Sequence, residues 1–336
     1  MGDGLTVIRV RGRAREASGL LAVTSRPLLE ARGWDAAFWT VLDEGPVEQA
    51  TMLIGRSAGD WTLEYPDFAV QPRKTADGEA LARHREHVYV FGSHFGGKSG
   101  LDAKRAFAAR FREDDLVAAD AEQVALEVWH DDFELHRSVN DALARSGVEL
   151  LPIRKKAREQ FIEQALKTGG GRIRDDDVPL NIEGIAFRPS GDLVLGLRCP
   201  VTEDGHPIVV ELAGYAQNFG GELPPVSGVW TLGTVRAKDA AVGIRDLEAE
   251  TDGETFSLIA GGLDKEVLRK KDRRNAGFAH WQATIPARQD DSPVPCRFVR
   301  ELPEDVERIE GVARDPDGGY VYLSDDEKRV VLLVGG

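Results

Sequence analysis

Residues 181–200 read NIEGIAFRPSGDLVLGLRCP, two short β-prone runs separated by a turn that contains proline and glycine. This arrangement is typical of a β-hairpin. Residues 77–95, 245–262 and 308–326 show the same pattern, and a looser copy runs from Ser18 to Glu44. In four copies an acidic residue is followed fifteen positions later by the end of the second strand: Glu79 with His94, Glu183 with Arg198, Asp246 with Gly261, and Glu310 with Asp325. The chain is therefore predicted to repeat one hairpin-containing unit.

The spacing of the copies favours a β-propeller. Successive units are 61 to 64 residues apart, except for one step of 104 residues between Glu79 and Glu183. Radial repetition of small sheets protects their edges, and a period of this size is typical of propeller blades. We expect an all-β, single-domain propeller over residues 1–336 with five blades. Six blades are an alternative, because the long step could contain a degenerate unit.

Two segments fall outside the simple repeat. The last unit lacks a fourth strand, and the apolar run at residues 5–10 is expected to pair with it and close the ring. Residues 116–170 are expected to be a helical insertion in or after blade two, because Ile153–Lys167 places apolar side chains on one helical stripe and ends at a run of three glycines.

Composition limits the classes of partner. The formal net charge is −14 and the isoelectric point about 5.1, which argues against nucleic acid or an anionic membrane as the main partner. Cys199 and Cys296 form neither a disulfide framework nor a metal-ligand spacing. The sequence contains no long apolar run of the kind that a signal peptide or a membrane span requires. We expect a cytoplasmic protein whose partner is a small-molecule substrate or another protein.

A first ring of candidate residues comes from the starts of the hairpins. Equivalent positions in successive blades surround the central channel of a propeller, so Glu79, Glu183, Asp246 and Glu310 are expected to converge there. Carboxylates at close range raise one another's pKa, which favours a compensating positive charge. A divalent cation such as calcium or manganese could supply it, and so could arginines and backbone amides. A purely structural role, in which these carboxylates tie neighbouring blades together, is the alternative.

A second ring comes from the ends of the second strands. It contains Asp43, His94, Arg198 and Asp325. These residues occupy equivalent positions in different units, but their side chains differ in chemical type. We expect His94, Arg198 and Asp325 to be catalytic, with His94 and Asp325 as proton carriers or ligands. Arg198 would also bind an anionic part of the substrate, and Asp43 is a further candidate for substrate binding.

Lys98 is the last candidate for substrate binding. It lies in residues 92–99, GSHFGGKS, which satisfy the pattern of a phosphate-binding loop. A nucleotide loop of this kind needs a helix and a parallel sheet after it. Because the segment occupies the same place in its hairpin as GLRCP and LSDDE do in two others, a nucleotide loop is not expected.

Several of these motifs, in this order, resemble a known family. VYVFGSH, NIEGIAF, LVLGLRCP, IEGVA and YLSDDE look like a bacterial propeller family classed as a domain of unknown function, which is related to the esterase-like propellers found beside phytases. The resemblance runs from about Gly19 to the C-terminus and implies a propeller fold. The more remote kinship with calcium-dependent lactonases and phytases implies metal-assisted ester hydrolysis at Glu183, Glu310 and Asp325. The chain lacks the dense acidic cluster of phytases, so phytase activity is not expected.

Together these features predict a metal-dependent hydrolase of a small ester, lactone or phosphoester that binds in an axial pocket. A divalent cation would polarise the substrate and lower the pKa of a bound water. Arg198 would hold an anionic group, and His94 would move protons. The alternative is a non-catalytic propeller that binds a protein partner through its top face and the helical insertion.

Overall fold

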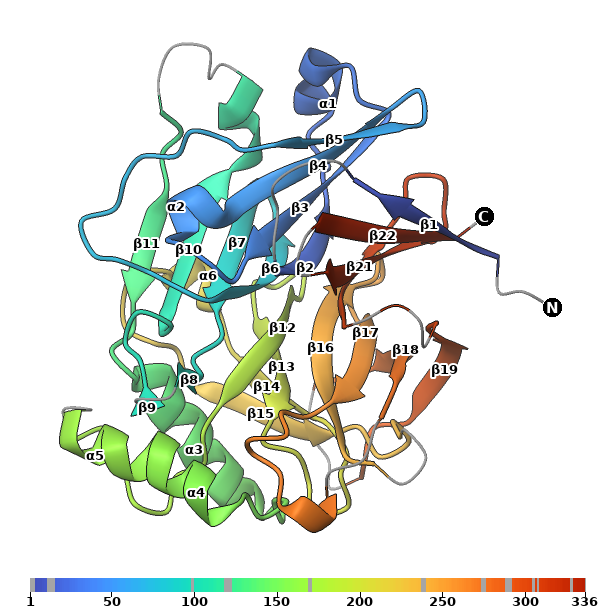
Figure 1. Ribbon diagram of the computed structural model, residues 1–336. Coiled ribbons are helices and arrows are strands. Elements are labelled where there is room, and N and C mark those ends of the chain that lie inside the picture. The colour runs from blue at the N-terminus through green and yellow to red at the C-terminus, as the bar shows by residue number, and fades with distance from the viewer. Residues whose placement is uncertain are drawn as a thin grey trace.

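Each predicted hairpin forms two neighbouring strands of a four-stranded antiparallel sheet, and five such sheets surround a central axis (Figure 1). The computed structural model describes residues 4–10, 16–97, 100–117, 123–168, 171–236, 240–272, 276–287, 292–303, 306, 308–326 and 329–335. The predicted five-bladed β-propeller is confirmed, and the alternative of six blades is wrong, because residues 118–180 add no sixth sheet within the described part of the chain.

The blades follow the chain in order, and each runs from an inner strand to an outer strand. Blade one contains β2 (Ala17–Ala22), β3 (Ala36–Leu42), β4 (Thr51–Ser57) and β5 (Asp60–Glu64). Blade two contains β6 (Gly78–His84), β7 (His87–Gly92), β10 (Phe107–Arg112) and β11 (Glu127–His130). Blade three contains β12 (Asn181–Phe187), β13 (Leu193–Cys199), β14 (Ile208–Leu212) and β15 (Val226–Thr231). Blade four contains β16 (Val242–Ala249), β17 (Thr255–Gly262), β18 (Phe278–Thr284) and β19 (Cys296–Glu301).

Blade five joins the two ends of the chain. Its strands are β20 (Ile309–Arg314), β21 (Tyr320–Asp326), β22 (Arg329–Gly335) and, on the outside, the N-terminal β1 (Leu5–Arg9). β1 pairs with β22 in antiparallel register, from Leu5 opposite Gly335 to Arg9 opposite Val331. The N-terminal strand thus supplies the outer edge of the last blade, as Figure 1 shows on the right of the molecule.

The core lies between neighbouring blades. The inner strands contact each other in a closed circle, β2 to β6, β12, β16, β20 and back to β2. Separate apolar clusters fill the spaces between blades; Trp39 lies in the cluster of blades one and two, and Trp230 in that of blades three and four. Because each blade buries one face against the next, the apolar alternation along the strands specifies the whole ring.

The helices of the segment at residues 116–170 follow blade two, after its outer strand β11. Helix α3 (Glu134–Ser146) begins where Asp131 accepts hydrogen bonds from the backbone N–H groups of Phe133 and Leu135, and it ends at Gly147 in the left-handed region. A second helical segment comprises α4 (Lys155–Arg158), a π-type turn at Glu159–Glu163 and α5 (Gln164–Thr168). Phe161 of this segment packs on Phe95, with ring centroids 4.4 Å apart. The helices therefore cover the same end of the propeller as the loop after β7.

The remaining elements are short. They are α1 (Arg26–Arg32), α2 (Val47–Ala50), α6 (Tyr215–Asn218), the 3₁₀ turns at Glu113–Val117 and Lys270–Asp272, and the two-residue strands β8 (Gly96–Gly97) and β9 (Gly100–Leu101). None of the helices in the described ranges has both the length and the apolar character needed to cross a membrane.

Candidate functional site

The inner strands start, and the second strands end, at one end of the central channel, because the two strands of each hairpin are antiparallel. We call this end the axial mouth. Near it, every inner strand has an irregularity in its pairing with the second strand, and bulges of this kind redirect a side chain. The residues left out of register in blades two to five are Glu79, Glu183, Arg245 and Glu310. One position of the repeat therefore presents a charged side chain in four blades.

In blades three to five these side chains neutralise one another. Arg245 Nη1 lies 2.9 Å from Glu183 Oε2, and Arg245 Nη2 contacts Glu310 Oε1. Arg198, near the end of β13, places Nη1 2.6 Å from Glu183 Oε1 and Nη2 2.9 Å from Asp264 Oδ1. Burial opposes the charged form of Arg198, but these carboxylates outweigh it and raise the pKa of its guanidinium. We call Glu183, Arg198, Arg245 and Glu310 the arginine cluster.

On the side of blades one and two the carboxylates are closer together and less compensated. One oxygen each from Asp43, Asp77 and Glu79 lies within 4.8 Å of the others, and we call these three residues the acidic cluster. Ser18 Oγ donates a hydrogen bond of 2.9 Å to Asp43, while Ser93 Oγ and Arg105 Nη1 donate to Asp77. In the described part of the chain no group donates a hydrogen bond to the Glu79 carboxylate.

The electrostatics of the acidic cluster follow from burial and like charge. Burial is the main cause that raises the pKa of Asp43 to about 8, and Asp77 adds to it. Burial followed by Asp43 and Asp77 raises the pKa of Glu79 well above its usual range. Burial also raises the pKa of Asp77, although Arg105 opposes the shift. The cluster is therefore short of positive charge, and an added cation would reverse these shifts.

Asp325 borders the acidic cluster at the end of β21. It lies at the same end of its hairpin in blade five as Asp43 does in blade one, and its charge contributes to the raised pKa of Asp43. Arg308 Nη1 donates a hydrogen bond of 3.0 Å to Asp325 Oδ2. The other oxygen, Oδ1, is buried and has no hydrogen-bond partner within the described ranges. A buried carboxylate oxygen without a partner is costly, which indicates that a ligand belongs there.

Asp246 does not belong to the ring, and this corrects the prediction from the sequence. Arg245 takes the expected place, one residue earlier. The Asp246 carboxylate instead accepts hydrogen bonds from the backbone N–H of Leu247 at 2.8 Å and of Val312 in blade five at 2.7 Å. Burial raises the pKa of Asp246 to about 8 despite these bonds. Its contacts are those of a link between blades, which is the structural role that the sequence left open.

His94 also lies away from the acidic cluster. Its backbone is in the left-handed region, with φ of 56°, and its buried ring lies with Nδ1 3.6 Å from Asp131 Oδ2. Burial lowers the pKa of this imidazole, and its charge influences that of His136 in helix α3. The preceding residue, Ser93, contacts the acidic cluster instead. Lys98 lies outside the described residues.

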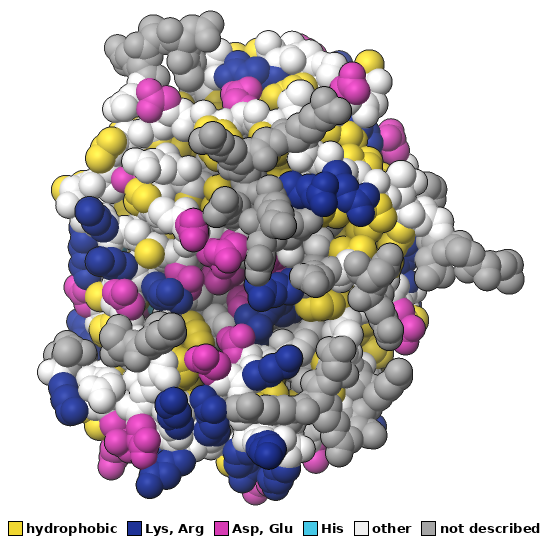
Figure 2. Space-filling model, viewed as in Figure 1, with side chains coloured by type: hydrophobic (Ala, Val, Ile, Leu, Met, Phe, Trp, Pro, Cys, Tyr) yellow, Lys and Arg dark blue, Asp and Glu magenta, His cyan; other side chains and the backbone are white. Residues whose placement is uncertain are grey.

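In Figure 2 acidic side chains gather near the centre of the face in view, with basic side chains next to them. At the axial mouth the ion pairs and the carboxylate distances separate Asp43, Asp77 and Glu79 from Arg198 and Arg245. The axial mouth is therefore divided into an acidic side and a side where arginines dominate.

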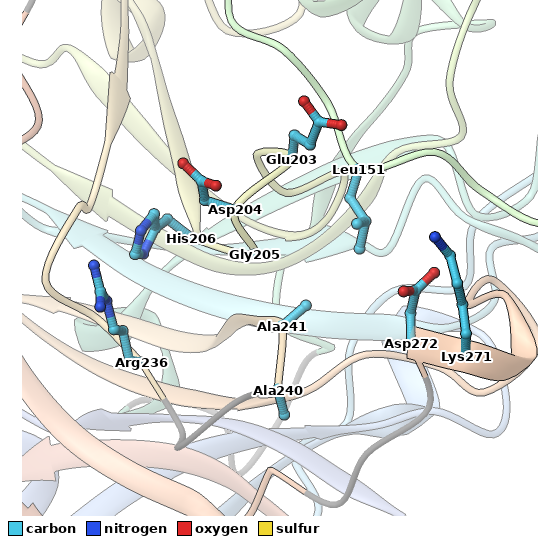
Figure 3. Close-up of a pocket in the computed structure, with 10 residues that line it drawn as sticks. All are labelled: Leu151, Glu203, Asp204, Gly205, His206, Arg236, Ala240, Ala241, Lys271 and Asp272. Atoms are coloured by element: carbon cyan, nitrogen blue, oxygen red, sulfur yellow. The ribbon is translucent and has the colours of Figure 1, made fainter.

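A larger cavity lies elsewhere in the described structure. It has a volume of about 760 Å³ and lies among loops near blades three and four (Figure 3). Glu203 and Asp204 point to one side of it, while Lys271 and Asp272 lie across from them. His206 Nδ1 is 3.2 Å from the carbonyl oxygen of Val235. These charged groups do not converge on a common point, so the axial mouth is the better candidate site.

Comparisons with known proteins find similarity of fold. No protein-family model and no curated protein match the sequence. Among solved structures, a glucose dehydrogenase has a TM-score of 0.45 and 18% identity, with 98% of this chain and 99% of that chain covered. A GH43 β-1,3-galactosidase with galactodeoxynojirimycin has a TM-score of 0.45 and 12% identity, with 97% of this chain and 94% of that chain covered. A calcium structure of the Trichoderma reesei family AA12 enzyme has a TM-score of 0.43 and 10% identity, with 100% of this chain and 96% of that chain covered.

These similarities bear on the prediction of family. Since no family model matches, membership of the propeller family of unknown function has no support beyond the fold. Calcium and galactodeoxynojirimycin belong to the structures that contain them. What the axial mouth of this chain binds is inferred below from its own residues.

Proposed function

We propose that the acidic cluster binds a divalent cation, calcium or manganese, and that the axial mouth then hydrolyses a small ester, lactone or phosphoester. The observation that carries the proposal is the convergence of Asp43, Asp77 and Glu79, whose oxygens lie within 4.8 Å of one another. The three carboxylates come from blades one and two, so the packing of these neighbouring blades brings them together.

The donor set suits a hard cation. Calcium takes six to eight oxygen ligands, chiefly from carboxylates, carbonyl groups and water. The acidic cluster offers carboxylate oxygens, and the Ser18 hydroxyl lies beside it. The unpartnered oxygen of Asp325 is a second observation that points to a ligand at this place. Neither cysteine belongs to the cluster, which disfavours a cation that prefers sulfur.

The neighbouring residues would have distinct roles in hydrolysis. A bound divalent cation would polarise the scissile bond and lower the pKa of a water molecule. Asp325 is held by Arg308 and keeps one oxygen without a partner, so it is placed to accept a proton from that water. Arg245 of the arginine cluster is fixed by Glu183 and Glu310, and its charge would stabilise negative charge that develops on the substrate.

Cation binding is tested by calorimetric titration of the chelator-treated full chain with calcium and with manganese. We expect one site in the wild type and at least about tenfold weaker binding in Glu79→Gln, since Glu79 supplies a ligand that no other group holds. Glu30→Gln, an exposed carboxylate of α1, is the matched control and should bind as the wild type does. A wild type that binds neither cation would overturn the proposal.

Hydrolysis needs its own test. The chain, with and without chelator, is assayed on small chromogenic esters, lactones and phosphoesters. The proposal expects turnover of one class that the chelator abolishes and that Asp325→Asn reduces by about 10² or more. Cation binding without turnover of any class would contradict hydrolysis and leave the non-catalytic propeller as the better explanation.

A further inference from the structure

A smaller cavity adjoins the arginine cluster. Its volume is about 120 Å³, which suits a group of a few non-hydrogen atoms. Four basic residues line it: Arg198, Arg245, Lys265 and Arg308. None of the described residues in its lining is acidic, although the carboxylates that pair with the arginines lie just behind them.

Two of these arginines have unused donors. The side chain of Arg245 is 5% exposed and that of Arg198 is 17% exposed. In each the Nε atom is buried and has no acceptor within the described ranges. A buried donor without an acceptor is destabilising, and a charged one more so. Both side chains line the cavity, and planar guanidinium groups recognise carboxylate and phosphate well.

Blade four makes room for this cavity by leaving out side chains. Gly261 and Gly262 end β17 where the equivalent strand of blade three ends with Arg198 and Cys199. A Cβ atom at Gly261 would lie 2.6 Å from Phe278 Cε1 and 3.0 Å from Arg245 Cγ, so glycine is required for both side chains to line the cavity. At Gly262 a Cβ atom would meet only Ala276 Cβ, at 3.5 Å, which is an ordinary contact.

We propose that this cavity is an oxyanion subsite that holds the phosphate or carboxylate group of the substrate, which makes the substrate an anionic ester. The anion is part of a substrate only if the proposed hydrolysis is correct, whereas binding of the anion does not depend on it. Arg245 joins the two sites, because it lines the cavity and also contacts Glu183 and Glu310 at the axial mouth. An anion held here would be adjacent to the bond that the acidic cluster is proposed to activate.

The test is calorimetric titration with inorganic phosphate and, separately, with acetate, in the presence of chelator so that cations do not contribute. We expect the wild type to bind at least one of them, and the one that binds better identifies the class of anion. The double variant Lys265→Gln with Arg308→Gln removes two cations from the rim and should weaken binding at least about tenfold. Lys155→Gln, an exposed lysine of α4, is the control and should not change it.

A steric variant keeps the test independent of charge. Gly262→Leu should fill the cavity without a backbone clash, so it should abolish anion binding while the unfolding temperature stays near that of the wild type. A wild type that binds neither anion, or a folded Gly262→Leu protein that binds as well as the wild type, overturns the subsite. If the wild type binds the cation but neither anion, the subsite is rejected and the proposed hydrolysis stands. If it binds an anion but no cation, the hydrolysis is rejected and the subsite stands.

Discussion

At the scale of single residues, one position separates a binding residue from a structural one. The inner strands of blades three and five read Ile-Glu-Gly at residues 182–184 and 309–311, and blade four reads Ile-Arg-Asp at residues 244–246. Arg245 occupies the position of the glutamate, and Asp246 occupies the position of the glycine. The glycine position faces the next blade. A Cβ atom at Gly184 would lie 2.8 Å from Leu247 Cβ, so this face has little room for a side chain. Asp246 instead bonds the backbone of blade five there.

The role of Asp246 leads to a prediction about stability. Asp246→Ala leaves the buried N–H groups of Leu247 and Val312 without their acceptor, so it should lower the free energy of unfolding by about 1–3 kcal/mol per unpaired group. Urea denaturation measures this loss. Cation affinity, measured by calorimetry, should stay within about twofold of the wild type. An unchanged stability together with lost cation binding would make Asp246 a ligand after all.

At the scale of elements, the bulged inner strands position the site residues, whereas the closing strand β1 stabilises the ring. The bulge recurs in all five inner strands, and in blades two to five it redirects one charged side chain toward the axial mouth. The closing strand β1 fixes the circle, because it covers the edge of β22 that would otherwise be open to solvent or to another chain. The first task serves the site, and the second serves the fold that carries it.

Removal of the closing strand should show its contribution. Deletion of residues 1–10 exposes the edge of β22 and should lower the unfolding temperature by on the order of 5–10 °C. A scan by circular dichroism measures the shift, and a synthetic peptide of residues 1–10, added in trans, should restore part of it. If the shortened chain unfolds at the temperature of the full chain, β1 does not hold the ring closed.

At the scale of the whole molecule, the ring brings together charges that the chain keeps far apart. Asp43 follows the second strand of blade one, Asp77 precedes the first strand of blade two, and Asp325 lies almost at the other end of the chain. Folding therefore confines like charges at one mouth, while the arginine cluster neutralises only the neighbouring side. This imbalance couples stability to pH and to cations.

The coupling can be measured with chelator present. Because the pKa of Asp43 is raised to about 8 in the folded chain from an ordinary value of 3.8, the folded state binds more protons than the unfolded state between these limits. The contribution of Asp43 to stability is therefore lost as pH rises toward about 8. Between about pH 6 and about pH 8 the wild type should lose up to about 1.4 kcal/mol per pH unit more than Asp43→Asn does.

The measurement is urea denaturation at a series of pH values, with and without saturating calcium. Calcium should flatten the pH dependence of the wild type, because a bound cation lowers the pKa of its carboxylate ligands. The Asp43→Asn variant serves as the control, since it lacks the titrating group. Equal slopes for the two proteins would mean that Asp43 does not titrate as its surroundings indicate.

Much of the architecture could be predicted, whereas the site could be predicted only in part. The repeat of hairpins indicated five blades, because alternation of apolar residues and turn chemistry are local properties that are legible in the sequence. Glu79 was expected at the axis, where it lies. Asp77, Arg245 and Asp264 were missed, although alignment of Ile-Arg-Asp with Ile-Glu-Gly would have found Arg245. His94 was misplaced, since its left-handed backbone turns the ring toward Asp131.

The sequence by itself determined the repeated hairpins and favoured five blades, and it placed Glu79, Glu183 and Glu310 at the axis, because strand periodicity and turns depend on neighbouring residues. Only the tertiary structure decided which charges meet. The pairing of Arg245 with Glu183 and Glu310, and the convergence of Asp43, Asp77 and Glu79, depend on bulges and on the packing of neighbouring blades. A shift of one residue at a bulge turns a side chain from the channel to the next blade, and distances between blades have no counterpart in the linear order of the chain.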